Sequence, residues 1–280
     1  MRLVTVRTGG GGTREGTSAG RVEGDSVVLL GARDLNELLE ADDWRTLAGG
    51  SGETIALDMT ALAPVVPRPP KIICLGLNYM RHIREMGHDV PDHPTIFAKY
   101  TSSLIGPRDE IQMPLVSERM DWEVELAVVI GTAGRNIPIA SALDHVAGYT
   151  IMNDISARDW QRRTTQFLQG KTFEHSTPVG PWLVTADELP AGGRGLAVRC
   201  EVDGVEMQSD TTAELIFPVA ETIAYLSQIF TLVPGDLIAT GTPDGVGAGR
   251  TPPVFLRPGQ TVRTAIEGIG ELVNVCSTAN

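Results

Sequence analysis

The sequence is poor in cysteine and in positive charge. Its three cysteines are widely spaced, so no pair forms a CxxC zinc knuckle, and Cys74 in an apolar run predicts a buried, reduced thiol. Lys and Arg number 23 against 35 Asp and Glu, and the formal net charge is −12. Such an acidic balance argues against nucleic acid or an anionic membrane as the main partner.

Long apolar runs are also missing. No stretch approaches the roughly 18 apolar residues that a membrane span needs. The first residues lack the continuous apolar core of an export signal. Together with the reduced thiols, these absences lead us to expect a soluble, cytoplasmic protein.

Glycine and proline, by contrast, are abundant. The chain has 31 glycines and 18 prolines, few long helical patterns, and 280 residues of which 42% are hydrophobic. This composition favours a turn-rich fold that is mainly β and large enough for a substantial core.

The chain divides at a proline-rich segment, APVVPRPPK at residues 63–71, which we expect to be an extended linker. We place a small N-terminal α+β domain at residues 1–66 and a larger domain at residues 67–280. The first domain shows strands at residues 3–7 and 26–30, a turn or loop at glycines 9–12, and one helix. That helix is predicted to begin after an Asp34 cap and to run toward Leu47.

One helix of the larger domain has a clear pattern. Val219, Ile223, Leu226 and Phe230 follow the i, i+4, i+7, i+11 spacing of an amphipathic helix. The segment at residues 234–247 then predicts a Pro-Gly-Asp turn, a short strand and a glycine-rich loop.

Two glutamates begin the apolar strand DWEVELAVVIG at residues 121–131. Because side chains alternate along a strand, Glu123 and Glu125 project from one face, about 6–7 Å apart. Asp154, at the end of the apolar stretch VAGYTIMND, adds a third carboxylate without any supporting thiol. Three hard oxygen donors suit Mg²⁺, Mn²⁺ or Ca²⁺ better than structural zinc. Acids of this kind also occur on exposed edge strands without a metal.

A possible acid–base pair precedes these acids. In NYMRHIRE, at residues 78–85, His82 and Glu85 lie three apart and share one face of a helix. A carboxylate that orients an imidazole is the arrangement of a general base. An ordinary exposed His–Glu pair on a surface helix would give the same pattern.

Cationic and amide side chains follow Asp154. Arg158 and Gln161 lie three apart, where the arginine either binds a substrate carboxylate or pairs with Asp159 or another surface acid. Lys171 stands beside a glycine in a polar interruption before a proline-rich turn, where a lysine is more often a solvated surface charge.

Together these segments resemble the fumarylacetoacetate hydrolase family. The motifs that carry the resemblance are, in chain order, NYMRHIRE at 78–85, DWEVELAVVIG at 121–131, GYTIMNDISARDWQ at 148–161, GKTFEHSTPVGPW at 170–182 and PGDLIATGTPDGVG at 234–247. The resemblance implies a mainly β (α+β) fold, in which a mixed β-sandwich or rolled catalytic domain follows a small accessory domain. It also implies a homodimer.

The same resemblance implies roles for individual residues. It makes Glu123, Glu125 and Asp154 the ligands of Mg²⁺ or Mn²⁺, with Ca²⁺ as a further option. It makes His82 and Glu85 a base dyad on a short lid helix. The remaining implied positions are a catalytic lysine, two substrate-binding residues and a threonine beside the oxyanion: Lys171, Arg158, Gln161 and Thr242.

Two departures from the family pattern fall near this site. Lys99-Tyr100 stands where members often have Lys-Pro, which affects the loop near the substrate. Glu174 and His175 replace the commoner residues after the catalytic lysine and alter the surroundings of the pocket. Neither departure removes a residue to which the chemistry is assigned.

The implied reaction is hydrolysis of a C–C bond in an acylpyruvate, such as fumarylpyruvate, in the breakdown of aromatic compounds. A divalent metal that chelates the small, anionic 2-oxo acid would stabilise the pyruvate enolate. His82 would deprotonate water, and Lys171 with groups near Thr242 would stabilise the oxyanion.

Other functions are also compatible with these residues. Decarboxylation of oxaloacetate-like acids, or isomerisation of 2-hydroxyhepta-2,4-diene-1,7-dioate, needs the same metal and enolate. A non-catalytic protein that keeps the fold is disfavoured, because the acids, the dyad and the lysine are all present. For the distal half of the substrate, Arg162 and Arg163 either bind a second carboxylate or are solvated helix residues.

Overall fold

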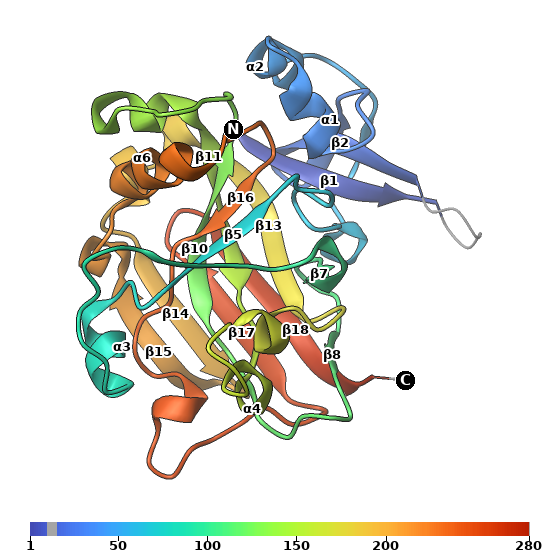
Figure 1. Cartoon of the computed structure of the whole chain (residues 1–280). Helices are drawn as coiled ribbons and strands as arrows, with labels where there is room; N and C mark the ends of the chain where they lie inside the picture. The colour runs from blue at the N-terminus through green and yellow to red at the C-terminus, as the bar shows by residue number, and fades with distance from the viewer. Residues whose placement is uncertain (10–15, 280) are drawn as a thin grey trace.

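The computed structural model describes residues 1–9 and 16–279, and within them two β-sheets and a two-stranded ribbon are surrounded by short helices (Figure 1). The larger sheet has eleven strands in the order β4-β3-β2-β1-β13-β11-β10-β16-β5-β6, with β7 paired to β13. Its strands are β1 (Arg2–Thr8), β2 (Gly16–Glu23), β3 (Ser26–Leu29), β4 (Thr54–Ala56), β5 (Ile72–Gly76), β6 (Thr95–Ala98), β7 (Leu104–Ile105), β10 (Val124–Ile130), β11 (Val146–Asn153), β13 (Thr177–Thr185) and β16 (Leu237–Ala239). This mainly β architecture confirms the expected fold class. Most of the glycine turn expected at residues 9–12 lies outside the described residues.

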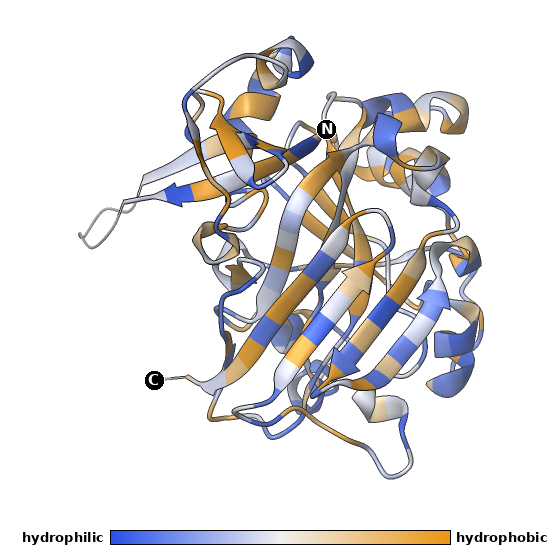
Figure 2. Cartoon of the chain, turned by 180° about the vertical axis from the view of Figure 1, so that it is seen from behind, coloured by the Kyte–Doolittle hydropathy of each residue, from blue (hydrophilic) through white to orange (hydrophobic). Residues whose placement is uncertain are grey.

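The second sheet covers one face of the first. Its five strands, in the order β15-β14-β17-β18-β8, are β15 (Val205–Thr211), β14 (Ala197–Val202), β17 (Thr261–Ile266), β18 (Gly270–Thr278) and β8 (Ile111–Met113). In β14 and β17 every second residue is buried, and Figure 2 shows hydrophilic and hydrophobic bands alternating along these strands. One face of this sheet therefore packs on the core and the other faces solvent, as antiparallel sheets commonly do.

Strand β10 is buried along its whole length and leads directly into the site. Its even-numbered residues within 124–130 belong to the core between the two sheets, whereas Ala127 and Val129 pack into a separate core on the opposite face. Because side chains alternate, Glu125 shares the face of Ala127 and Val129. Glu123, two residues earlier, continues the same series. The polar site is thus on the face turned away from the second sheet.

The N-terminal strands continue the larger sheet, because β1 pairs antiparallel with β13 at Leu3 and Leu183. The proline-rich segment at residues 63–71 has no helix or strand, but it is packed rather than loose. Val65 and Val66 are fully buried, and the Thr5 hydroxyl donates to the Val65 carbonyl at 2.9 Å. The division at residue 66 stays a prediction.

The expectation of one helix from Asp34 toward Leu47 is wrong. Asp34 does cap α1 (Leu35–Glu40), since its carboxylate accepts the Glu37 N–H at 2.9 Å. Ala41 then adopts an extended conformation, and a separate helix, α2 (Trp44–Ala48), follows. The intervening Asp42-Asp43 pair favours turns over helix interiors, which the apolar spacing alone does not reveal.

The other helices lie around the sheets and include the expected amphipathic one. They are α3 (Met80–Glu85), α4 (Arg158–Gln161), α5 (Leu168–Lys171) and α6 (Val219–Ile229). The 3₁₀ turns are η1 (Met59–Ala61), η2 (Thr101–Ser103), η3 (Ile139–His145), η4 (Ala186–Glu188), η5 (Ala191–Gly193), η6 (Thr212–Glu214) and η7 (Gly247–Gly249). A ribbon of β9 (Met120–Asp121) and β12 (Ser156–Ala157) leads into α4. In the part of the chain that the structure describes, no helix is long and apolar enough to cross a membrane.

Candidate active site

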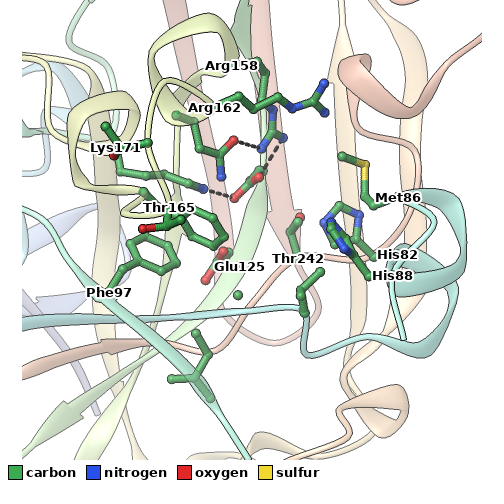
Figure 3. A pocket seen from close by; sticks show the side chains of 17 residues that line it. His82, Met86, His88, Phe97, Glu125, Arg158, Arg162, Thr165, Lys171 and Thr242 are labelled. Carbon is green, nitrogen blue, oxygen red and sulfur yellow. Dashed lines mark hydrogen bonds and ion pairs between the residues drawn. The ribbon is translucent and has the colours of Figure 1, made fainter. Parts of the chain in front are cut away.

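A cavity of about 490 Å³ is lined from one side by residues of α3 and from the other by residues of α4 and α5 (Figure 3). Most of the side chains singled out from the sequence line it: His82, Glu123, Glu125, Arg158, Gln161, Lys171 and Thr242. The other two, Glu85 and Asp154, contact lining residues directly. The fold therefore brings together candidates that are spread over 161 positions of the sequence, from His82 to Thr242.

The three acids form one cluster. Glu123, Glu125 and Asp154 are buried, and one carboxylate oxygen from each lies within 4.8 Å of the others. Antiparallel strand pairing explains part of this arrangement. Val124 of β10 lies opposite Asn153 of β11, so Glu123, one residue before, adjoins Asp154, one residue after. The Asp154 N–H also donates to the Glu123 carbonyl at 2.8 Å.

Cationic side chains surround two of these acids. The Lys171 ammonium bridges them, 2.5 Å from Glu123 Oε2 and 2.7 Å from Asp154 Oδ2. Arg158 lies 2.6 Å from the other Glu123 oxygen. Burial alone would raise the pKa of Glu123, but Lys171 and Arg158 outweigh it and lower that pKa to about 2.

Glu125 is in a different electrostatic position. Its Oε2 accepts the Gly241 N–H at 2.7 Å, and within the described residues no cationic side chain lies within 4.0 Å of it. Burial, followed by the negative charges of Asp154 and Glu123, raises its pKa well above the usual value. A cation next to Glu125 would relieve this, and the buried donor set consists of hard carboxylate oxygens. The cluster therefore fits a divalent metal such as Mg²⁺, Mn²⁺ or Ca²⁺.

The His82–Glu85 pair is formed as the helical spacing predicts. His82 Nδ1 lies 3.2 Å from Glu85 Oε2, and His82 is only 7% exposed although it lines the pocket. The other Glu85 oxygen accepts the Gly245 N–H at 2.9 Å. Glu85, the last residue of α3, thus contacts both His82 and the glycine-rich loop, and it orients the ring of His82.

Arg158 pairs with acids, but these acids are buried rather than on the surface. Its Nε donates to Asp121 Oδ2 at 2.7 Å, in addition to the Glu123 contact. Its Nη1 donates to the Gln161 side-chain oxygen at 3.0 Å, which leaves the two N–H donors of the Gln161 amide for other partners. Arg158 therefore positions a cluster acid, and its contact with substrate stays a prediction.

Thr242 lines the cavity with its hydroxyl already engaged. The hydroxyl donates to the Val124 carbonyl at 2.9 Å and accepts from Gln208 Nε2 at 2.7 Å. Its single proton is thereby used, so it reaches an oxyanion as a donor only by giving up the contact with Val124.

Two residues of the cluster were not predicted from the sequence. Lys99 Nζ lies 2.6 Å from Asp154 Oδ1, but no role in the cluster was expected for Lys99 from the sequence. Asp121 accepts from Arg158 and from the Gly247 and Ala248 backbone N–H groups. The sequence could have indicated Asp121, because it stands two residues before Glu123 and thus continues the same period-two series of acids.

Comparison with known proteins identifies relatives over most of the chain. Residues 71–277 match the model "Fumarylacetoacetate (FAA) hydrolase C-terminal". The human protein "Oxaloacetate tautomerase FAHD2A, mitochondrial" is 48% identical over 219 residues, which is 78% of this chain and 69% of that protein.

The similarity to solved structures extends over the whole chain. A putative HpcE protein from Mycobacterium smegmatis superposes with a TM-score of 0.89 at 38% identity, covering 100% of both chains. A maleylpyruvate hydrolase from Sphingobium sp. SYK-6 superposes with a TM-score of 0.80 at 30% identity, again over 100% of both chains.

Proposed function

The chain belongs to the fumarylacetoacetate hydrolase family, and we propose that it hydrolyses a C–C bond in acylpyruvates such as fumarylpyruvate, with Mg²⁺ or Mn²⁺ as cofactor. The observation that carries the proposal is the position of the His82–Glu85 dyad and the acidic cluster on one cavity. A solved structure of the same fold, named as a maleylpyruvate hydrolase, supports the substrate class. We further propose a homodimer that acts in the cytoplasm in the breakdown of aromatic compounds.

The acidic cluster would hold the reacting end of the substrate. Glu123, Glu125 and Asp154 would bind the metal, which supplies Lewis-acid stabilisation of the charge that develops on the 2-oxo acid. Lys171 and Arg158 contact the two oxygens of Glu123 and orient this carboxylate.

The dyad would activate water. In the tautomer whose Nδ1–H donates to Glu85, Nε2 of His82 would take a proton from water as the hydroxide adds to the distal carbonyl. The C–C bond to the pyruvate half then breaks, and its electron pair enters the enolate. Return of the proton to the enolate carbon gives pyruvate and a carboxylic acid, so one water is consumed.

A second candidate is keto–enol tautomerisation of oxaloacetate. It is favoured by the human relative that carries this activity in its name and is 48% identical over 78% of this chain. Proton removal beside the carbonyl and proton return would use the same base, and no water would be consumed. Decarboxylation of oxaloacetate-like acids and isomerisation of 2-hydroxyhepta-2,4-diene-1,7-dioate are further outcomes of the same enolate chemistry.

One screen separates hydrolysis, tautomerisation and decarboxylation. The purified protein is incubated with fumarylpyruvate, acetylpyruvate and oxaloacetate, with added Mg²⁺ or Mn²⁺ or with EDTA, and the products are identified. We expect metal-dependent release of pyruvate and a second acid from an acylpyruvate. If only oxaloacetate is turned over and its mass is conserved, the protein is a tautomerase rather than a hydrolase. Release of CO₂ would indicate a decarboxylase.

A further inference from the structure

The cavity contains one arginine without an acidic partner. Three lysine or arginine side chains line it, namely Arg158, Arg162 and Lys171. Arg158 and Lys171 form ion pairs with cluster acids, whereas Arg162 has no side-chain hydrogen bond or ion pair to any residue within 1–9 and 16–279. The charge of Arg162 is therefore available to a ligand.

The neighbouring arginine has a different environment, although the sequence did not distinguish the two. The Arg163 guanidinium lies 3.5 Å from the centroid of the Trp160 ring, in a cation–π contact. It is not among the residues that line the cavity. The structure thus separates a pocket arginine from a surface arginine at adjacent positions.

Arg162 is exposed at the outer end of the cavity, whereas the three acids are buried. It and its neighbours Thr164 and Thr165 are exposed and polar, whereas the acidic cluster is at the buried end. Figure 3 shows Arg162 extending from the α4 side toward the side of the pocket where Met86 and His88 lie. Apolar side chains, including Met86 and Phe97, also line the cavity. A ligand that matches these walls has two polar ends joined by a short carbon chain.

We propose that Arg162 binds the terminal carboxylate of a dicarboxylic acylpyruvate, so that the enzyme prefers substrates with an anionic distal end. This inference rests on the proposed function, since it assumes that the 2-oxo acid end lies at the acidic cluster. The planar guanidinium can donate two parallel hydrogen bonds to a carboxylate, which a neutral end group cannot accept equally well. Arg162 also provides local attraction for a dianion in a protein whose formal net charge is −12.

The test compares two matched variants on two matched substrates. Arg162→Gln and Arg163→Gln are assayed with fumarylpyruvate and with its terminal amide, which has the same skeleton but no distal charge. We expect the kcat/KM ratio of acid to amide to fall about ten-fold in Arg162→Gln and to stay unchanged in Arg163→Gln. The ratio within one variant cancels any general loss of folded enzyme. An unchanged ratio in Arg162→Gln would overturn the inference.

A binding measurement keeps the test valid if the protein hydrolyses no acylpyruvate. In the presence of Mn²⁺, the dissociation constants of 2-oxoadipate and of its monocarboxylic analogue 2-oxohexanoate are measured by calorimetry. Preference for 2-oxoadipate in the wild type, lost in Arg162→Gln and kept in Arg163→Gln, supports the distal site even where the proposed reaction fails. Equal binding of the two acids by the wild type contradicts it.

Discussion

Lys99 Nζ lies 2.6 Å from Asp154 Oδ1, and neither side chain is exposed to solvent. Lys171 contacts the second Asp154 oxygen at 2.7 Å, so two ammonium groups hold the one carboxylate. Unpaired burial of either charge would be costly, and the pairs remove that cost only if their geometry is kept. The orientation of Asp154 is consequently fixed before any ligand binds.

Loss of the general base should separate chemistry from binding. We expect His82→Ala to lower kcat for acylpyruvate hydrolysis by about 10²–10⁴-fold, the usual contribution of a positioned proton acceptor. Mn²⁺ affinity, measured by calorimetry, should not change, because His82 is not part of the acidic cluster. Unchanged turnover in this variant would show that the dyad is not the base.

Glu125 should be needed for the metal but not for the fold. Glu125→Gln should weaken Mn²⁺ binding by more than about 100-fold, since a ligand matters at least as much as its supporting contacts. In EDTA the variant should be as stable as the wild type or more so, because burial and two neighbouring acids oppose the charge of Glu125. Glu206→Gln, at an exposed position, is the control. Retained Mn²⁺ affinity in Glu125→Gln would remove it from the metal site.

Arg158 should contribute to stability as well as to the site. Arg158→Met leaves Asp121 and Glu123 without their guanidinium partner in a buried environment. We expect a loss of about 3–5 kcal/mol in the free energy of unfolding, measured by urea denaturation. Arg158→Lys should recover only part of it, because an ammonium cannot reproduce the fork that reaches both acids. A variant as stable as the wild type would show that these pairs are energetically neutral.

A methyl group at position 249 should disturb the dyad while leaving the fold intact. A Cβ on Gly249 would lie 2.4 Å from Glu85 Cδ, so the flexible Glu85 side chain must move away. We expect Gly249→Ala to lower kcat with normal Mn²⁺ binding and a normal melting temperature. In Gly49→Ala the new Cβ meets only backbone oxygens, at 3.5 and 3.6 Å, so activity should persist. Full activity in Gly249→Ala would mean that the position of Glu85 is unimportant.

The three thiols should be unreactive in the folded protein. Burial, with a smaller effect of Asp203, raises the pKa of Cys276 to about 12, and burial raises those of Cys74 and Cys200 well above the usual value. Since only the thiolate attacks a disulfide reagent, Ellman's reagent at pH 8 should label no cysteine until denaturant is added. Rapid labelling of the native protein would contradict the burial.

The same thiols make stability depend on alkaline pH. Between the usual pKa of 9.0 and about 12, the unfolded chain has lost the Cys276 proton and the folded protein still holds it. The folded state therefore binds more protons in this range, and its stability falls as the pH rises. Replacing Cys276 with alanine should flatten this part of the curve of unfolding free energy against pH.

Local patterns in the sequence predicted several features correctly because short-range geometry determines them. The strand period placed Glu123 and Glu125 on one face, and helical spacing paired His82 with Glu85. The amphipathic helix α6 and the Asp34 cap were predicted for the same reason. By contrast, the break at residues 41–43 depends on turn-forming aspartates that an apolar pattern does not register.

By itself, the sequence determined which residue types stand at which local spacing, and hence a mainly β chain with three acids, a dyad and a lysine. Only the tertiary structure decided their partners. Lys99 pairs with Asp154, 55 positions away in the sequence. Arg158 pairs with Asp121 and Glu123. Arg162 lines the cavity, whereas Arg163 does not. The physical reason is that strand pairing and core packing set contacts between distant segments, whereas periodicity reports only the face on which a side chain lies.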